Sequence, residues 1–139
     1  MMQAGMNIPP HYSVRRLATG SVRIARTAHT APMASLTMDG FTIQNGLAQG
    51  MSSGDISQTY AFGGGIYSEH AALVLSNLVL RGNQVVGGST SQPEGGRGAG
   101  GGLAMNNDDW SVATATGDLH DVTFENNVAQ GGSGGDHGG

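Results

Sequence analysis

The sequence predicts an all-β protein made of stacked repeats, a β-solenoid, and three observations lead to this fold class. Glycine supplies 25 of the 139 residues, far above its average usage of about 7%. A glycine-rich motif recurs at a fixed spacing, and short apolar segments with a period of two residues accompany it. No stretch has an apolar face at helical spacing. We expect about two to three coils with long glycine-rich loops.

The N-terminal part of the chain differs in charge from the rest. Residues 1–38 hold four arginines and no acid, whereas 39–139 hold ten acids and two arginines. An Arg-rich, acid-poor start is also typical of organelle transit peptides, but no apolar stretch of a signal peptide is present. Residues 1–33 are therefore predicted to be a poorly ordered or partial lead-in. The repeats are predicted to occupy 34–139.

The first repeat motif is a glycine triplet followed by an apolar residue. "GGGIY" begins at residue 63 and "GGGLA" begins 37 residues later. A further step of 37 residues reaches 137–139, so we expect the chain to end inside a third copy. The motif residues are Gly63, Gly64, Gly65 and Ile66 in the first copy and Gly100, Gly101, Gly102 and Leu103 in the second.

The last nine residues, "GGSGGDHGG", also resemble a calcium-binding nonapeptide. Gly131, Gly132, Gly134 and Asp136 fall in place. The position that needs a large aliphatic anchor holds Gly138, so the truncated third repeat is the preferred interpretation.

The second repeat element is a set of apolar columns. Segments 36–50, 73–88 and 119–132 superimpose when Ile43, Leu80 and Phe124 are aligned, and two further apolar columns then appear. Stacked repeats bury such columns in a common core, about 4.8 Å apart. The three columns are Met38/Leu75/Leu119, Phe41/Leu78/Val122 and Ile43/Leu80/Phe124.

Alternation within each segment predicts short strands. Leu78 and Leu80 point to one side of the strand and Val79 to the other. Threonine and valine suit a sheet surface, and neither transfers protons at neutral pH. The residues expected to face outward are Thr37, Thr42, Val74, Val79 and Thr123.

Gly and Asn positions predict the bends. The column Gly40/Asn77/Asp121 holds residue types that tolerate left-handed backbone. Asn83 and Asn127 are expected at equivalent corners, with their amides bonded to backbone groups that the bend leaves unpaired. Residues 50–60 and 84–99 are expected to be loops with no packing pattern.

The pairing of a glycine triplet with a downstream "FxxN" resembles the repeats of chlamydial polymorphic outer membrane proteins. Phe124–Asn127 matches "FxxN" outright, Leu80–Asn83 has Leu for Phe, and Ile43–Gly46 departs at both ends. The motif is similar to that of right-handed parallel β-helix proteins with a pectate-lyase-like fold. The resemblance covers about 34–139. It implies a secreted or surface-displayed segment of a longer protein, with a role in adhesion.

Candidate site residues are few. Asp118, His120 and Asp121 place two carboxylates and an imidazole within four residues, which suits acid–base chemistry or calcium but also an exposed corner. Asp108, Asp109 and Trp110 form a polar loop that could contact a sugar or a metal. The five histidines lack metal-ligand spacing. We expect no catalytic residue, no metal and no cofactor.

Composition limits the classes of partner that the chain is expected to bind. A net charge of −4 and the absence of lysine argue against nucleic acid. No cysteine is present, and no run approaches the 18 apolar residues of a membrane-spanning helix. Carbohydrate or a host-surface protein is the expected partner, with self-association through open solenoid ends.

Two function classes remain open. The first is a non-catalytic structural or adhesive segment of an exported or cell-surface protein. The second is a fragment of a polysaccharide-active enzyme whose active site lies elsewhere, and a non-functional open-reading-frame remnant is a third possibility. Thr/Val columns on the outer face favour the first class, whereas a cluster of carboxylates and Arg across coils would favour the second.

Overall fold

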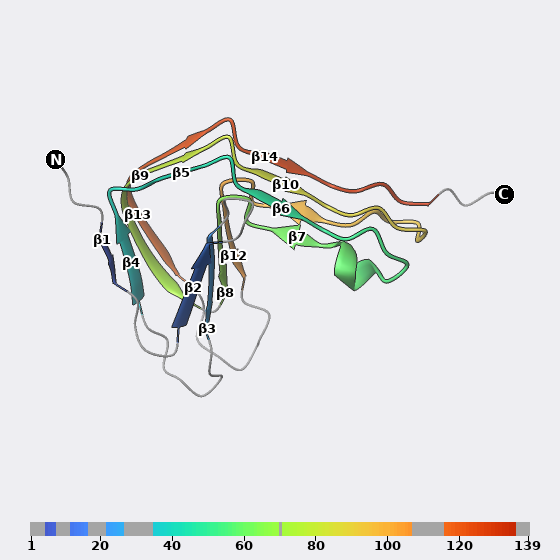
Figure 1. Cartoon of the computed structure of the whole chain (residues 1–139), viewed down its shortest axis with the longest axis horizontal. Coiled ribbons are helices and arrows are strands. Elements are labelled where there is room, and N and C mark those ends of the chain that lie inside the picture. The colour runs from blue at the N-terminus through green and yellow to red at the C-terminus, as the bar shows by residue number, and fades with distance from the viewer. Residues whose placement is uncertain are drawn as a thin grey trace.

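A computed structural model describes residues 5–7, 12–16, 22–26, 35–69, 71–106 and 116–135. The prediction of an all-β chain is confirmed, since the described helical segment is one short 3₁₀ turn at Ile56–Thr59. Most strand pairs are parallel and join segments one repeat apart (Figure 1). Segments 35–69, 71–106 and 116–135 are called repeats 1, 2 and 3 below.

The largest sheet carries the predicted apolar columns. Its order is β1-β4-β9-β13, and β5 also pairs with β9. Strands β4, β5 and β13 run parallel to β9, whereas β1 is antiparallel to β4. The bounds are β1 Gly5–Asn7, β4 Ser35–Asp39, β5 Thr42–Gln44, β9 Ala72–Arg81 and β13 Gly117–Glu125.

Three smaller sheets complete the arrangement. Their orders are β14-β10-β6, β11-β7 and β12-β8-β3-β2, and β2–β3 is the antiparallel pair among them. The bounds are β2 Tyr12–Arg16, β3 Val22–Arg26, β6 Leu47–Gln49, β7 Ala61–Phe62, β8 Ile66–Glu69, β10 Gln84–Val86, β11 Gly98–Ala99, β12 Leu103–Asn106 and β14 Val128–Gln130.

The predicted register is confirmed in both motifs. Leu80 pairs with Ile43 on one side and with Phe124 on the other. In the glycine motif, Leu103 pairs with Ile66, which preserves the spacing of 37 residues seen in the sequence. Each repeat therefore lies against the next with equivalent residues side by side.

The predicted first bend is also confirmed. Gly40, Asn77 and Asp121 have φ of 75°, 51° and 52°, in the left-handed region that Gly, Asn and Asp tolerate. A second bend lies one residue before the predicted position. It is formed by Asn45, Gly82 and Asn126, with φ of 56°, 59° and 50°.

The core lies on the inner face of the largest sheet and against β8. Leu78 and Leu80 are fully buried, whereas Thr42 is exposed, as the alternation predicts. The buried cluster consists of Leu36, Met38, Ile43, Ile66, Ala71, Leu73, Leu75, Leu78 and Leu80. The partly buried side chains that pack against it are Phe41, Leu103, Met105 and Val122.

Repeat 3 departs from the predicted burial, and here the prediction is wrong. Leu119, Val122 and Phe124 stand in register with fully buried leucines of β9. Leu119 and Phe124 are nevertheless 41% and 49% exposed, and Val122 is only half-buried. The cause is their position on β13, which has β9 on one side and no described strand on the other. Burial of a column residue needs neighbours on both sides, and the sequence column alone does not supply them.

Three strands lie within the predicted lead-in 1–33. Strand β3 pairs in parallel with β8, and β2 then pairs with β3 in the antiparallel sense. The sheets therefore begin earlier in the chain than the repeat motifs do.

The two asparagines that follow the second bend form a ladder between repeats. Asn83 is fully buried; its Oδ1 accepts from the Gly46 N–H at 2.9 Å, and its Nδ2 donates to the Ile43 carbonyl at 3.0 Å. Asn127 repeats this pattern, accepting from the Asn83 N–H at 3.0 Å and donating to the Leu80 carbonyl at 2.7 Å. The predicted role of these amides is confirmed.

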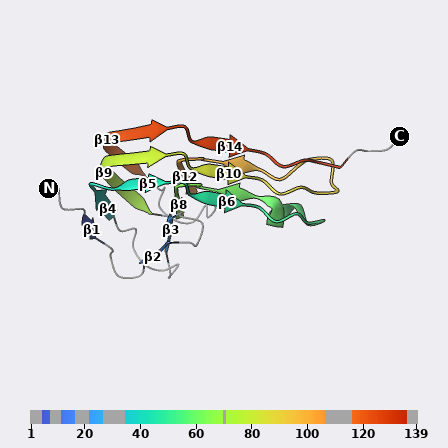
Figure 2. The same ribbon diagram turned by 45° about the horizontal axis from the view of Figure 1, so that its top comes forward.

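The prediction that 50–60 and 84–99 lack a packing pattern is wrong. These residues, together with β6, β7 and 128–135, form an arm that projects away from the largest sheet (Figures 1 and 2). Outgoing strands β6, β10 and β14 stack in parallel, and so do the returning strands β7 and β11. Between the two layers, the Gly88 N–H donates to Thr59 and the Gly132 N–H donates to Gly96.

Close backbone contact explains the glycine content of the arm. A Cβ on Gly87 would lie 2.1 Å from the Gly96 carbonyl oxygen, and one on Gly132 would lie 2.0 Å from that of Gly88. The first contact joins the two layers and the second joins neighbouring repeats within the outgoing layer, and no side chain separates the backbones at either point. The glycines are therefore needed for this packing, and not merely for flexibility.

We expect Gly87→Ala to destabilise the protein by about 1–3 kcal/mol, because the new methyl group must push the two layers apart. Gly54→Ala is the matched control, since a Cβ there meets nothing within 4 Å. The measurement is urea denaturation of both variants. Equal midpoints would contradict the close packing of the arm.

Candidate functional site

Polar residues gather at the first bend, where β4 ends and where β9 and β13 change direction. Asp39 and His120 both pair with Ser76, so these three side chains form one row across the repeats. Asn77 and Asp121 follow at the bend itself. This set of five residues is called the polar corner.

Asp39 is held by two donors from the next repeat. The Ser76 hydroxyl donates to Oδ1 at 2.7 Å and the Asn77 amide donates to the same atom at 2.8 Å. The bond from Asn77, and then that from Ser76, lowers the pKa of Asp39 below its ordinary value because both favour the charged form. Asp39 is therefore ionised at neutral pH and links repeats 1 and 2.

Of the predicted trio, the structure brings two members together. His120 Nε2 lies 3.0 Å from Asp118 Oδ1, and both side chains are 65% exposed. Such an exposed pair contributes little to stability. Asp121 supplies a left-handed residue of the bend. Asp108, Asp109 and Trp110, like Asp136 and Gly138 of the possible calcium motif, lie outside the described residues.

Sequence reasoning missed Asp39 and Ser76, and it identified Asn77 only as a bend residue. A signal was available, because Asp39 and Ser76 are separated by the same 37 residues as the glycine triplets. Positions one repeat apart are neighbours in space, so an acid and a hydroxyl at that spacing form a hydrogen-bonded pair.

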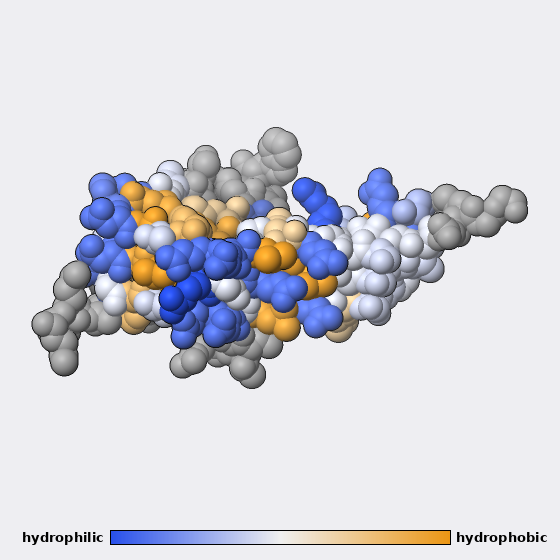
Figure 3. Space-filling view, turned by 90° about the horizontal axis from the view of Figure 1, so that it is seen from above, coloured by the Kyte–Doolittle hydropathy of each residue, from blue (hydrophilic) through white to orange (hydrophobic). Residues whose placement is uncertain are grey.

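A second polar row crosses the outer face beyond the first bend. Arg81 donates to Gln44 Oε1 at 2.8 Å and lies 4.0 Å from Glu125 Oε2 on its other side. The space-filling view from above shows hydrophilic residues beside apolar ones on this face, and the outer part of the arm is mostly near neutral in hydropathy (Figure 3). The row joins a cation, an amide and a carboxylate across three repeats.

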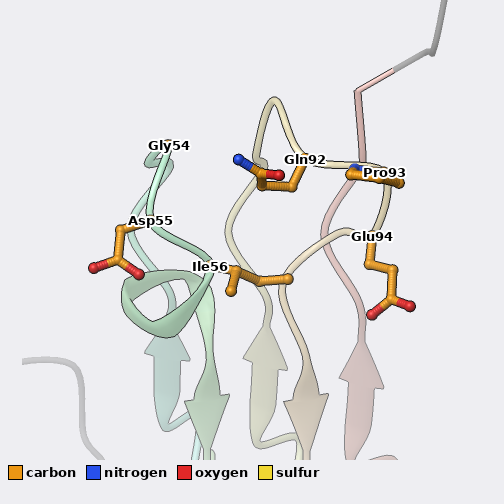
Figure 4. A pocket seen from close by; sticks show the side chains of 6 residues that line it. All are labelled: Gly54, Asp55, Ile56, Gln92, Pro93 and Glu94. Carbon is orange, nitrogen blue, oxygen red and sulfur yellow. The ribbon is translucent and has the colours of Figure 1, made fainter.

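A shallow hollow of about 350 Å³ lies at the tip of the arm. Asp55 and Glu94 stand at opposite ends of it, with Ile56 between them (Figure 4). The Asp55 carboxylate is engaged by the Ser57 hydroxyl at 2.7 Å and by the Ser57 N–H at 3.0 Å, which lowers its pKa. Gly54, Gln92 and Pro93 complete the lining. The separated carboxylates do not converge on a common point.

We expect Asn77→Gly to raise the pKa of Asp39 toward the ordinary value of about 3.9, since it removes the strongest donor while glycine keeps the left-handed bend. The pKa of Asp39 is lower in the folded protein than in the unfolded chain. Asp39 therefore stabilises the folded protein slightly at a pH above its unfolded-state pKa, and this stabilisation is lost as the pH falls through its folded-state pKa. NMR titration of the Asp39 carboxyl measures the change. Asn126→Gly, the same substitution at the second bend, should leave this titration unchanged, and an equal shift in both variants would contradict the assignment.

Among the described residues, no group of three His, Asp or Glu side chains is placed to hold a metal ion. The described helical segment is also too short and too polar to span a bilayer. Comparisons with protein-family models, curated proteins and solved structures give no match to this chain.

Proposed function

We propose that the chain is a segment of a right-handed parallel β-helix in an exported or cell-surface protein, with a non-catalytic structural or adhesive role. The observation that carries the proposal is the asparagine ladder. Asn83 and Asn127 use their amides to bind the backbone of the preceding repeat, and equivalent residues stack in register on either side of them. This arrangement holds successive coils together and exposes long outer faces.

The ladder also gives a physical reason for the "FxxN" motif. The aromatic or aliphatic residue belongs to an inner column, and the Asn three positions later bonds both to backbone and to the next Asn. Gly46 stands in this column in repeat 1, where its N–H is the group that Asn83 binds. These contacts support the resemblance to polymorphic outer membrane protein repeats.

The outer faces support a scaffold more than an enzyme. Exposed Thr42 and Thr123 flank half-buried Val79 in one outward column. The charged residues described nearby, Arg81 and Glu125, are joined to each other across repeats. A fragment of a polysaccharide-active enzyme remains the alternative, and activity on a uronate polymer would favour it.

The outer edge of repeat 3 offers a surface for self-association. Leu119, Phe124 and Val128 are 41%, 49% and 48% exposed along β13 and β14. An edge strand with exposed apolar residues is a template for pairing with another chain. We expect concentration-dependent dimerisation in analytical ultracentrifugation, weakened by Phe124→Asp and unaffected by Thr42→Asp on the outer face. A monomer at every concentration would remove this part of the proposal.

The function is tested by coating beads with the folded chain and measuring their retention on polysaccharide and cell surfaces. Beads coated with the Leu80→Asp variant, which we expect to be unfolded, are the control. Retention above this control, without release of unsaturated products from polygalacturonate, is the expected result. Retention equal to the control, or turnover of the polymer, would overturn the proposal.

A further inference from the structure

Three aromatic side chains gather at the bend between the arm and the β12-β8-β3-β2 sheet, and they lie outside the core. Phe62 and Tyr67 are stacked, with ring centroids 5.9 Å apart and an interplanar angle of 20°. Tyr60 meets Phe62 edge-on at 6.4 Å and 73°. Tyr60, Phe62 and Tyr67 are called the aromatic strip. They make up three of the seven aromatic residues in the chain.

The backbone explains why these rings meet. Gly63 has φ of 65°, so β7 and β8 join at a sharp angle (Figure 1). Ala61 and Ile66 are buried, and the residue that follows each of them therefore points outward. The two outward rings stack across the bend.

The neighbouring repeat places small side chains beside two of the rings, and on its other side Tyr67 pairs with Arg23 of β3. Phe62 pairs with Ala99 and Tyr67 pairs with Ala104, so only methyl groups stand in register with the rings on that side. Phe62 and Tyr67 are half-buried, and Tyr60 is exposed. The core does not require these rings, since none of them belongs to the buried cluster or packs against it.

Polar groups border the rings. The Asn106 amide donates to the Tyr67 hydroxyl at 3.2 Å, and Tyr60 brings a second phenol. Aromatic rings with a polar edge suit ligands that are apolar on one face and wet at the rim. A pyranose ring has this character, because its axial C–H bonds form an apolar face and its hydroxyls surround it.

Charge selects among ligands that stack on aromatic rings. Nucleic acids also stack on such rings, but they need a positively charged groove to hold the phosphates. Arg23 of β3 pairs in register with Tyr67, but one cation beside the strip is not such a groove. The net charge of the chain, −4, opposes phosphate and uronate polymers alike. From stacking, polar rim and charge together, we propose that the aromatic strip binds a neutral pyranose polysaccharide. This inference rests on the adhesive role proposed above and names its ligand class.

The test is isothermal titration of the whole chain with cellohexaose, xylohexaose and chitohexaose. We expect one of the three to bind, and Phe62→Ala or Tyr67→Ala to weaken its binding about tenfold. Tyr67→Phe keeps the ring and should lose less. Met51→Ala, which changes an exposed apolar residue on the arm, is the control and should bind like the wild type. Circular dichroism of each variant establishes that it is folded.

The outcomes separate this inference from the proposed function. If beads coated with the chain are retained on surfaces but no neutral oligosaccharide binds, the strip is not the ligand site and the adhesive role stands. Preferred binding of polygalacturonate or single-stranded DNA would overturn the inference, as would unchanged affinity in folded Phe62→Ala and Tyr67→Ala. If the beads are not retained and no oligosaccharide binds, both proposals fail.

Discussion

Leu80→Asp is expected to prevent folding. Leu80 is fully buried in the middle of the largest sheet, between Ile43 and Phe124. A carboxylate buried there would lose its hydrogen bonds to water without gaining a donor or a cation in their place, which costs several kcal/mol. The whole stability of a domain this size is only about 5–15 kcal/mol. We therefore expect the β-sheet signal in circular dichroism, and the cooperative urea transition, to disappear.

Thr42→Asp is the matched control for this substitution. Thr42 precedes Ile43 on the same short strand, but its side chain is exposed. The same acidic group placed there stays in water and should change the free energy of unfolding by no more than about 0.5 kcal/mol. A folded Leu80→Asp variant together with an unfolded Thr42→Asp variant would show that the inner and outer faces have been exchanged.

Asn83→Ala is expected to have the second largest effect, although it changes a polar residue. The substitution leaves the Gly46 N–H and the Ile43 carbonyl without their buried partner, and it removes the bond to Asn127. Each buried group left unsatisfied costs about 1–3 kcal/mol. We expect the free energy of unfolding to fall by about 3 kcal/mol or more, as a lower urea midpoint with an unchanged slope.

Gln84→Ala provides the comparison for this loss. Gln84 is the next residue in the chain and is exposed on β10. Its truncation should shift the midpoint little, because an exposed side chain is not part of a buried network. If Asn83→Ala costs less than about 1 kcal/mol, the ladder is not what holds repeats 1 and 2 together.

Register and the first bend were predictable because each carries a side-chain signal. Ile43, Leu80 and Phe124 are large and apolar, and their alternation with residues such as Thr42 fixes which face is buried. Asn77 and Asp121 are residue types that tolerate a left-handed bend. The 37-residue spacing of the glycine triplets then showed which residues of different repeats are equivalent.

The arm was not predictable from the same signals. Its packing is made by backbone against backbone at residues such as Gly87 and Gly132, which have no side chain to reveal a buried face. A glycine packed between layers and a glycine in a mobile loop have the same hydropathy, so a hydropathy pattern does not distinguish them. The exposure of Phe124 and the incomplete burial of Val122 were missed for a different reason, since both depend on what lies beyond β13.

The polar corner was predictable only in part. His120 and Asp121 were found as part of a local cluster, whereas the role of Asp39 was found only in the structure. Its partners are one repeat away in the chain, and a search confined to local motifs does not join them. The aromatic strip likewise depends on a bend that brings Phe62 and Tyr67 together across the glycine triplet.

The asparagine ladder has a mechanical consequence. Its hydrogen bonds join one repeat to the next, and so do those of the parallel strands, so tension that draws the repeats apart acts on these bonds directly. The same tension acts at every boundary, so the boundary with the weakest set of bonds breaks first. Equivalent residues of repeats 1 and 2 are 37 positions apart, and each residue adds about 3.6 Å when extended. A stretched molecule would thus lengthen by about 130 Å for each repeat released, and it would absorb work at every step while the remaining repeats stayed folded.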